Sequence, residues 1–458
     1  MSKSEVFVLK FGGTSVQDAT AMRRVVEITR SEGGTVPVVV TSACAGITND
    51  LVACGECCRK MDQQGADEIV QQISERHHQI LKDLCGENPA HNCSSELEEM
   101  LGELRQLVHG TILLGETTPR TIDTILSFGE RLSSLLLRTA FQSAGINAAL
   151  VDSRDFIITE SQHGSAVPIM AEIERRTPEI INPMREEYDA IIAQGFIGRT
   201  ADGITTTIGR GGSDHTAALI GGGLGAKEIQ IWTDVDGVMT ADPRIVSEAL
   251  VVPEMTFTEA RELAWFGAKV IHPDTILPAV AKNIPVVIRN SHAPAAPGTR
   301  IWPDSHQIPP GFHSLTIKRN LRLIELATKI PGEGREIIDT AIASFARYDA
   351  PIECAVIAES RASILVSEST WNDRLRVALE SVCLVQTHPK MALLCLSGSG
   401  LRTTPSLLAS PLTALTDISI RLIAAGSSDH VVLLGIEEAE AEKGLRGVHG
   451  RLFGENEE

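Results

Sequence analysis

The chain of 458 residues carries 41 lysines and arginines against 59 aspartates and glutamates, which gives a formal net charge of −18. Its length accommodates two or three domains, and its 43% hydrophobic and 22% charged residues are ordinary for a soluble globular protein. The negative charge excludes nucleic acid and anionic membrane surfaces as expected partners, because both would repel the chain.

Three further features of the composition indicate a cytoplasmic protein. No run of 18 apolar residues occurs, and the N-terminus lacks the apolar core of a signal peptide. Nine cysteines, an odd number, fit free thiols in a reducing compartment. The Cys54-x-x-Cys57-Cys58 motif has no second pair at zinc-site spacing, which disfavours a metal centre there.

The first predicted strand, residues 6–11, carries a lysine close to its end. Two glycines and two hydroxyl residues follow it: Gly12, Gly13, Thr14 and Ser15. Glycines let backbone N–H groups approach phosphate oxygens, and Lys10 supplies a mobile positive charge. The segment therefore predicts a site for a polyphosphate, although no G-x-x-x-x-G-K-[ST] motif occurs in the chain.

Short apolar runs alternate with helical patterns through the first 300 residues. Strands are expected at 6–11, 37–41, 148–151, 190–194, 228–233 and 285–289, and helices at 19–31, 122–143 and 214–222. This alternation predicts an α/β fold, with a parallel sheet covered by helices on both faces. The polar stretch 61–109 is interpreted as a helical insertion.

A proline-rich stretch, residues 293–310, predicts a linker. Two weakly similar strand–helix–strand units follow it. Elements of the first are expected at 315–326, 333–345 and 362–366, and those of the second at 391–396, 405–415, 418–423 and 430–435.

Six segments resemble, in order, the aspartate kinases of the amino acid kinase family. They are Lys10–Ser15, Thr41–Asn49, Ser127–Ser133, Gly195–Asp214, Trp232–Arg244 and Gly267–Pro273. The resemblance implies an amino acid kinase fold over residues 1–302, with a mostly parallel sheet between helical layers. The C-terminal units resemble tandem ACT domains, which implies two βαββαβ regulatory modules at 303–386 and 387–458.

The resemblance further implies phosphorylation of the side-chain carboxylate of L-aspartate to 4-phospho-L-aspartate, the first step of the lysine, threonine and methionine pathway. Catalysis would fall to Lys10 and Asp214. Glu130 would pair with the substrate ammonium group and Arg210 with a carboxylate, because a planar guanidinium matches a carboxylate bidentately. The implied substrate-binding residues are Thr48, Glu130, Phe196, Arg210 and Ser213. From the sequence, Ser213 or Asp214 is also expected to cap a helix that begins near His215.

ATP and Mg²⁺ are the implied cofactors, with the metal held mainly by ATP phosphates and water rather than by a dedicated protein site. The implied nucleotide-binding residues are Lys10, Gly12, Gly13, Thr14, Ser15, Ser42, Thr233, Asp234, Arg244 and Lys269. Met239 stands where the family usually has tyrosine, which removes a hydroxyl group and an aromatic face from the expected adenine site.

Two alternatives remain at this stage. The chain could act on glutamate or acetylglutamate, or it could be an inactive amino-acid-sensing regulator. The resemblance also implies a homodimer or a higher homo-oligomer, and a lysine or threonine effector at the ACT interface. Ala425 and Val431 replace the glutamine and asparagine that the family usually carries in the second module, so we expect weakened feedback control.

Overall fold

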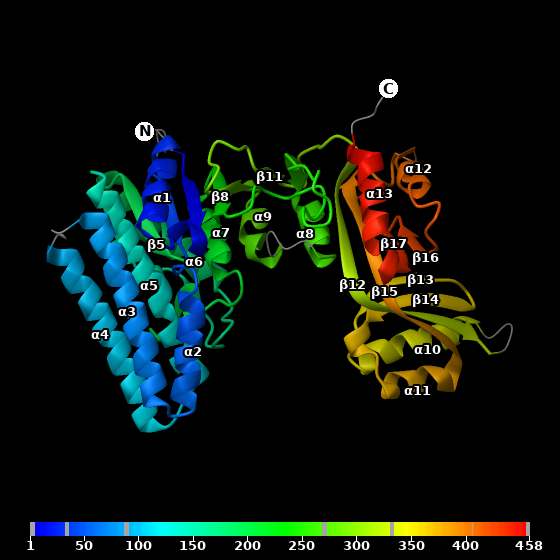
Figure 1. Cartoon of the computed structure of the whole chain (residues 1–458), viewed down its shortest axis with the longest axis horizontal. Helices are drawn as coiled ribbons and strands as arrows, with labels where there is room; N and C mark the ends of the chain where they lie inside the picture. The colour runs from blue at the N-terminus through cyan, green and yellow to red at the C-terminus, as the bar shows by residue number, and fades with distance from the viewer. Residues whose placement is uncertain are drawn as a thin grey trace. The chain divides into compact units, whose positions relative to one another are not determined.

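A computed structural model describes residues 5–32, 36–86, 91–267, 273–329, 334–404 and 406–454. The chain forms two compact units (Figure 1). The first unit comprises Met1–Gly237 and Ile271–Pro303, and the second comprises Val238–Val270 and Asp304–Glu458. The domain boundaries expected from the sequence stay a prediction. Among the described residues, no helix has the length and apolar character needed to cross a membrane.

A largely parallel sheet forms the centre of the first unit. Its strands are β1 (Phe7–Phe11), β2 (Val38–Thr41), β3 (Ala148–Val151), β5 (Ala190–Gln194), β8 (Glu228–Thr233), β10 (Val286–Asn290) and β11 (Thr299–Trp302). Within this unit they follow the order β3-β5-β2-β1-β8-β10-β11. All neighbours run parallel except β10 and β11. The predicted strands and the predicted parallel sheet are confirmed.

Helices cover both faces of this sheet. One face packs against α1 (Ala19–Ser31), α2 (Ile47–Arg59) and α5 (Pro119–Ser143), and the other against α6 (Met170–Glu187) and α7 (Gly212–Leu224). Since side chains alternate along a strand, Leu9 and Phe11 enter the core on the α5 side, whereas Lys10 points toward α7. The lysine therefore lies on the face opposite this large core.

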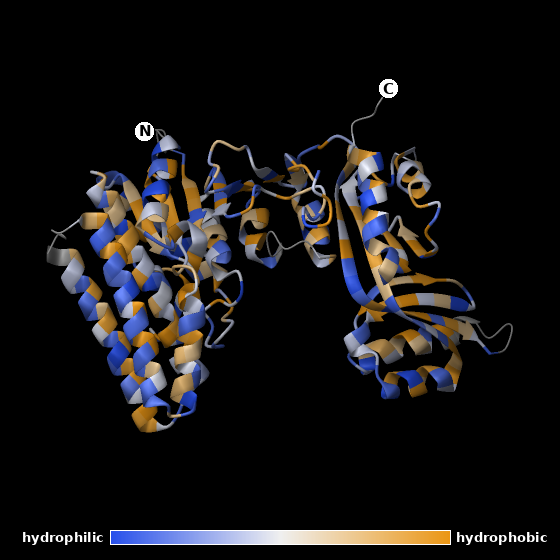
Figure 2. Ribbon diagram, in the orientation of Figure 1, coloured by the Kyte–Doolittle hydropathy of each residue, from blue (hydrophilic) through white to orange (hydrophobic). Residues whose placement is uncertain are grey.

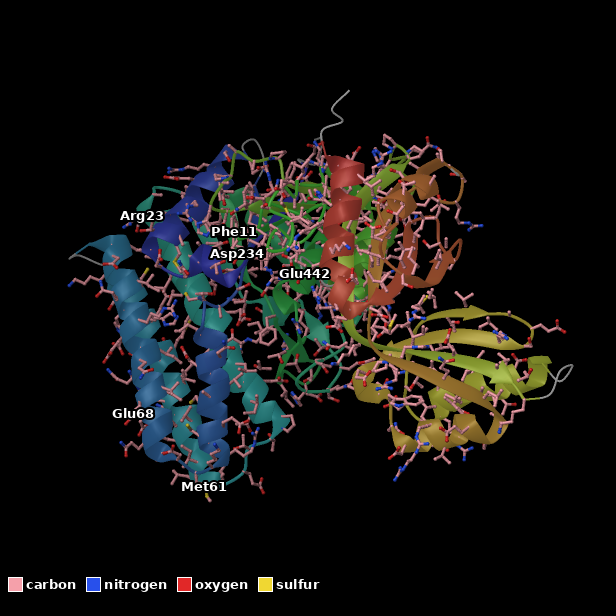
Figure 3. The ribbon with its side chains drawn as sticks, turned by 45° about the vertical axis from the view of Figure 1, so that its right-hand side comes forward. Phe11, Arg23, Met61, Glu68, Asp234 and Glu442 are labelled. Atoms are coloured by element: carbon pink, nitrogen blue, oxygen red, sulfur yellow. The ribbon has the colours of Figure 1, made fainter. Side chains whose placement is uncertain are left out.

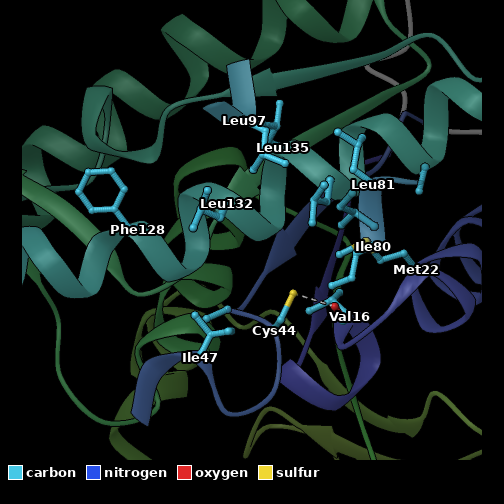
Figure 4. Packing of buried hydrophobic residues seen from close by; sticks show 14 of the residues in the cluster. Val16, Met22, Cys44, Ile47, Ile80, Leu81, Leu97, Phe128, Leu132 and Leu135 are labelled. Atoms are coloured by element: carbon cyan, nitrogen blue, oxygen red, sulfur yellow. Dashed lines mark hydrogen bonds between the residues drawn. The ribbon is translucent and has the colours of Figure 1, made fainter. Parts of the chain in front are cut away.

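The core beneath α5 is continuous from the sheet to the helical insertion (Figure 4). Leu97, Leu132 and Leu135 pack in it, and the Cys44 thiol donates a 3.1 Å hydrogen bond to the Val16 carbonyl oxygen. The predicted insertion is confirmed as α3 (Gln63–Cys85) and α4 (His91–Leu114). Figure 2 shows mixed hydrophobic and hydrophilic faces on these helices. Together with α2 and α5 they form a helical arm, and Met61 lies at its end (Figure 3). The arm thus extends the core of the first unit.

The first unit also contains a small second sheet of three strands. It orders β4 (Ile158–Thr159), β6 (Ile197–Thr200) and β7 (Thr205–Thr207) side by side. Part of the predicted linker also belongs to this unit, because residues 293–298 join the antiparallel strands β10 and β11. Gly298 adopts a φ of 72°, and a Cβ there would lie 2.0 Å from the Ile288 carbonyl oxygen. That segment is a tight turn rather than an interdomain connection.

The second unit contains a six-stranded sheet in the order β13-β14-β12-β15-β17-β16. Its strands are β12 (Gly311–Thr328), β13 (Ile352–Ile357), β14 (Arg361–Ser367), β15 (Cys383–Ser399), β16 (Ile420–Ala425) and β17 (Val431–Glu437). The helices α10 (Gly334–Arg347) and α11 (Asp373–Val382) belong to one core, whereas α12 (Ser406–Thr413) and α13 (Ala441–Phe453) belong to another. Two α/β modules therefore share one sheet.

The two long strands β12 and β15 pass through both modules. Residues 311–318 of β12 pair with the end of β15, whereas residues 321–328 pair with its beginning. A register shift lies between these halves, at Asn320, which has a φ of 59°. The first half of β12 therefore belongs to the module that contains β16 and β17, although in sequence it comes before the module that contains β13 and β14. Sequence reading took 315–326 as one strand and missed this division, although the polar residues Lys318, Arg319 and Asn320 interrupt the apolar run there.

Candidate active site

The site begins where the parallel strands β1, β2, β8 and β10 end. The Gly12 amide donates a 3.0 Å hydrogen bond to the Trp232 carbonyl oxygen, and the Ser42 amide donates a 3.1 Å bond to that of Phe11. The Ser291 amide donates to the Thr233 carbonyl oxygen at 2.9 Å. The loops after these strands thus meet at one edge, as parallel topology requires.

Glycine permits the tight packing of the loop after β1. A Cβ on Gly13 would lie 2.9 Å from the Ala43 carbonyl oxygen, a separation that real side chains do not adopt. The loop continues as a short 3₁₀ helix, Gly13–Val16, in which Thr14 is half-buried and Ser15 is buried. The Ser15 hydroxyl donates a 2.8 Å hydrogen bond to Ser291 Oγ, which fixes the loop against the end of β10.

Lys10 and Asp214 form an ion pair across the site. Lys10 Nζ lies 2.6 Å from Asp214 Oδ1, in an arrangement whose angles are not those of a hydrogen bond. Both side chains are more than four-fifths buried, so their attraction is screened less than at the surface. The sequence placed both residues in the catalytic set, and the structure brings them together.

Asp214 is positioned by the first turn of α7. Sequence reading expected Ser213 or Asp214 to cap a helix near His215; this was wrong, because α7 begins at Gly212 and Gly211 is its N-cap, with a φ of 70°. Since glycine adopts this conformation without a Cβ clash, no side-chain cap is needed. The Asp214 carboxylate therefore lies in the first turn of α7, at the positive end of the helix dipole.

Two glycines, Gly195 and Gly212, allow Ser213 and Phe196 to pack closely against the backbone. A Cβ on Gly195 would lie 2.5 Å from Ser213 Oγ, and one on Gly212 would lie 2.6 Å from the Phe196 ring. Phe196 itself has a φ of 65°, which is strained for an aromatic residue. Its amide donates a 3.0 Å hydrogen bond to Thr216 Oγ1 on α7, which holds this conformation. Phe196 and Ser213 thus adjoin each other, as the prediction requires.

Glu130 carries a buried carboxyl group with one hydrogen-bonded oxygen and one oxygen that lacks a partner in the described part of the chain. It lies on α5 with 3% of its surface exposed, and its Oε1 accepts a 3.1 Å hydrogen bond from the Ala43 amide. Its Oε2 is buried and has no hydrogen-bond partner among the described residues. Loss of solvation raises the pKa of Glu130 to about 8, an effect that the Ala43 hydrogen bond opposes. Such an acceptor suits a cationic ligand.

The other two predicted aspartate-binding residues are more accessible. Arg210 is exposed and lies between Gly209 and Gly211, whose φ values are 79° and 70°. Thr48 is half-buried in the first turn of α2, next to Gly46. Both belong to the first unit and to loops at the same end of the sheet, where ligands bind in parallel α/β folds.

The predicted nucleotide residues divide into two groups. Thr233 and Asp234 lie at the end of β8, where the Thr233 hydroxyl donates a 3.1 Å hydrogen bond to Asp234 Oδ1. Arg244 and Met239 belong to the second unit, where Arg244 pairs with Asp242 at 2.6 Å. Lys269 lies outside the described residues. The binding roles of all these residues stay predictions.

Sequence reading missed two parts of this region. Ser291 follows the predicted strand 285–289, so its position after a parallel strand could have indicated it. Asp123 gave no such signal, because its partners Thr207, His163 and Gly164 lie at least 40 residues away. Among the described residues, no group of three or more His, Cys, Asp or Glu side chains forms a metal site.

Residues 5–290 match the amino acid kinase family, and residues 394–452 match an ACT domain. The chain is 34% identical to lysine-sensitive aspartokinase 3 of Escherichia coli, over 98% of this chain and all of that protein. The chain is an aspartokinase family member. A second aspartokinase, aspartokinase 1 of Arabidopsis thaliana chloroplasts, is 32% identical over 97% of this chain and 80% of its own length.

Solved aspartokinase structures show the same fold. E. coli aspartokinase III with aspartate and ADP superposes with a TM-score of 0.77 at 33% identity, covering 98% of this chain and all of that one. The same enzyme with lysine and aspartate gives 0.79 with the same coverage. The Clostridium acetobutylicum enzyme gives 0.81 at 23% identity, covering 97% of this chain and all of that one. The expected amino acid kinase and ACT folds are thereby confirmed.

Proposed function

We propose that this chain transfers the γ-phosphoryl group of ATP to the side-chain carboxylate of L-aspartate, at the start of the lysine, threonine and methionine pathway. A carboxylate oxygen bonds to the γ-phosphorus, the bond from that phosphorus to the bridging oxygen breaks, and ADP leaves. The observation that carries the proposal is the buried Glu130 Oε2, which lacks a hydrogen-bond partner within the described part of the chain, in a site that also contains Lys10 and Asp214. The relationship to aspartokinases, one of them crystallised with aspartate and ADP, supports it.

The acceptor is recognised by its charges. Glu130 pairs with the α-ammonium group, and Arg210 binds a carboxylate with its planar guanidinium. Thr48, Phe196 and Ser213 complete the aspartate contacts. The attacking carboxylate is ionised near neutral pH, so no general base is required, and the main barrier is repulsion between two anions.

The phosphate side of the site neutralises that repulsion. Lys10 stabilises the negative charge that develops on the transferred group, while Gly12, Gly13, Thr14, Ser15 and Ser42 line the phosphates. Asp214 and the nearby hydroxyl groups offer only oxygen ligands, which suit Mg²⁺. The metal, when bound with ATP, adds positive charge to the phosphates. Asp214 also holds Lys10 on this side of the sheet.

The nucleotide side is assigned by resemblance. By that resemblance, Thr233 and Asp234 would contact the ribose, and Arg244 and Lys269 would contact the phosphates. Met239 stands where the family usually has tyrosine, so the expected adenine site lacks the hydroxyl group and the aromatic ring of that residue.

An ADP-release assay separates this function from related activities. Purified full-length chain is assayed with ATP, Mg²⁺ and either aspartate, glutamate or acetylglutamate. Activity with aspartate alone is expected. Activity with glutamate and none with aspartate would overturn the substrate, and inactivity with all three acceptors would favour an amino-acid-sensing regulator.

The ACT modules extend the proposal to regulation. We assign them a lysine or threonine effector, in line with their sequence match and with the lysine-sensitive E. coli relative. Association through these modules would give a homodimer or a higher homo-oligomer, because an unpaired sheet edge favours pairing. We also propose a cytoplasmic location, as expected from the amino-acid composition.

A further inference from the structure

Asp123 is a fully buried carboxylate that the proposed reaction does not use. It has no exposed surface and lies on α5. Oδ1 accepts a 2.6 Å hydrogen bond from the Thr207 hydroxyl, Oδ2 lies 2.7 Å from His163 Nδ1, and both oxygens lie 3.1 Å from the Gly164 amide nitrogen. Both carboxylate oxygens are therefore occupied by donors from two other segments.

These contacts join the elements that carry the two proposed aspartate ligands. Asp123 precedes Glu130 by seven residues, which is two turns along the same face of α5. Thr207 ends β7 and precedes Arg210 by three residues. One carboxylate thus ties the helix of the proposed ammonium ligand to the strand that leads into the proposed carboxylate ligand.

The loop that contains Gly164 reaches the Arg210 turn directly. The Ala166 amide donates a 2.9 Å hydrogen bond to the Thr207 carbonyl oxygen. A Cβ on Gly209 would lie 3.3 Å from Ser165 Cβ, so this loop packs against the residue before Arg210. Asp123 holds the same loop through its hydrogen bonds with the Gly164 amide and His163. The turn that presents Arg210 is therefore held on two sides by groups bound to Asp123.

We propose that Asp123, through Thr207 and the Gly164 loop, is a positioning residue that sets Arg210 relative to Glu130 for aspartate binding. The proposal rests on the assignment of Arg210 and Glu130 as aspartate ligands. Burying a carboxylate without exposure is costly, and its multiple hydrogen bonds offset that cost while fixing the geometry of three segments. Loss of this anchor loosens the aspartate site and leaves the phosphate loop after β1 intact.

The test compares two variants with a matched control in steady-state kinetics. Asp123→Asn keeps the size of the side chain but removes its charge and replaces one acceptor oxygen by an amide donor, and Thr207→Val removes the hydroxyl donor. Thr206→Val is the control, because Thr206 is equally buried on the adjacent position of β7, and its hydroxyl lies 2.8 Å from Thr159 Oγ1 instead. Thr207→Ser restores the hydroxyl group.

The KM for aspartate is expected to rise about tenfold in Asp123→Asn and Thr207→Val, consistent with a lost hydrogen bond to a charged group. The KM for ATP stays within about twofold, and Thr206→Val and Thr207→Ser keep the wild-type KM for aspartate. An equal effect of Thr206→Val, or unchanged aspartate KM in a folded Thr207→Val variant, would overturn the positioning role. Thr207→Val keeps the proposal testable where Asp123→Asn does not fold.

A double variant separates this proposal from the assignment beneath it. If Thr207 acts through Arg210, adding Thr207→Val to Arg210→Lys raises the aspartate KM far less than it does alone. Full additivity would contradict action through Arg210. If instead Arg210→Lys and Glu130→Gln each leave the aspartate KM unchanged, the ligand assignment fails first, and the positioning role fails with it.

Discussion

Lys10 Nζ and Asp214 Oδ1 lie 2.6 Å apart, although 204 positions separate them in the sequence. The first residue comes from the central strand β1 and the second from the first turn of α7. In the unliganded chain the carboxylate balances the lysine charge in a largely buried place. In the proposed reaction, the phosphates of ATP would give Lys10 further negative partners on this side of the sheet.

Replacing Lys10 by alanine is expected to lower kcat by a factor of about 10²–10³, comparable to losing one oxyanion-hole donor. The aspartate KM should stay within a few-fold, because Lys10 acts on the charge of the transition state. Lys227→Ala is the control, since Lys227 is half-exposed and pairs with Glu5 at 2.6 Å. Steady-state assays measure both variants, and near wild-type turnover in Lys10→Ala would remove its catalytic role.

The sequence predicted what depends on local pattern. Alternating apolar runs indicated the parallel sheet, and the motifs around Lys10, Glu130 and Asp214 indicated side chains that the fold brings to its site. The burial of Glu130 was not visible, because it depends on the Ala43 loop packing against α5. Asp123 was missed for the same reason, since its contacts with Thr207 cross 84 positions.

The sequence predictions were wrong or incomplete where the local pattern fitted two different structures. The start of α7 was predicted too late, because a glycine in the left-handed conformation replaced the expected side-chain cap. The division of β12 between two modules was missed, because the polar residues Lys318, Arg319 and Asn320 interrupt its apolar run without showing which partner each half has. Strand pairing is decided by tertiary packing rather than by composition.

The KM for aspartate is expected to fall as pH rises toward about 8. Loss of solvation raises the pKa of Glu130 to about 8, so below this pH the group is mostly neutral and cannot pair with the substrate ammonium. KM should fall roughly tenfold per pH unit from about pH 6.5 and level off above the pKa. Glu130→Gln should have a high KM with little pH dependence. A flat wild-type profile would contradict the pairing.

The same residue is expected to lower the stability of the chain as pH rises from 4.5 to about 8. Its pKa is raised in the folded chain from the ordinary 4.5 to about 8, so its stabilising contribution is complete below 4.5 and is lost as pH rises to about 8. Between these pH values, the free energy of unfolding of Glu130→Gln relative to that of the wild type should increase by about 1.4 kcal/mol per pH unit. Thermal melting of both proteins at several pH values measures this, and an equal difference in Tm throughout would contradict the burial effect.

Arg210→Lys is expected to raise the aspartate KM about tenfold or more, because an ammonium group cannot reproduce the paired hydrogen bonds of a guanidinium. The KM for ATP should stay nearly constant. Arg175→Lys is the matched control, since Arg175 is half-exposed on α6 and pairs with Glu172 and Glu179 there. Unchanged aspartate KM in Arg210→Lys would show that the acceptor binds elsewhere.

Feedback inhibition by lysine or threonine is expected to be weak. Ala425 is exposed at the end of β16, and Val431 is buried among apolar residues at the start of β17, so neither offers a side-chain hydrogen bond. Both line a pocket of about 710 Å³ in the second unit. Each missing hydrogen bond to a charged ligand costs roughly 1.5–3 kcal/mol, which together weakens binding about a hundredfold or more.

Inhibition curves with lysine, threonine and both together measure this weakness. Half-inhibition is expected only above roughly millimolar concentration, given the two missing hydrogen bonds. Ala425→Gln tests the cause, because the position is exposed and accepts a longer side chain without disturbing the core. That variant should be inhibited at lower effector concentration than the wild type, with the same kcat and substrate KM values in the absence of effector. Wild-type half-inhibition at sub-millimolar lysine or threonine would contradict weakened control, since other groups of the pocket would then supply the hydrogen bonds that Ala425 and Val431 do not make.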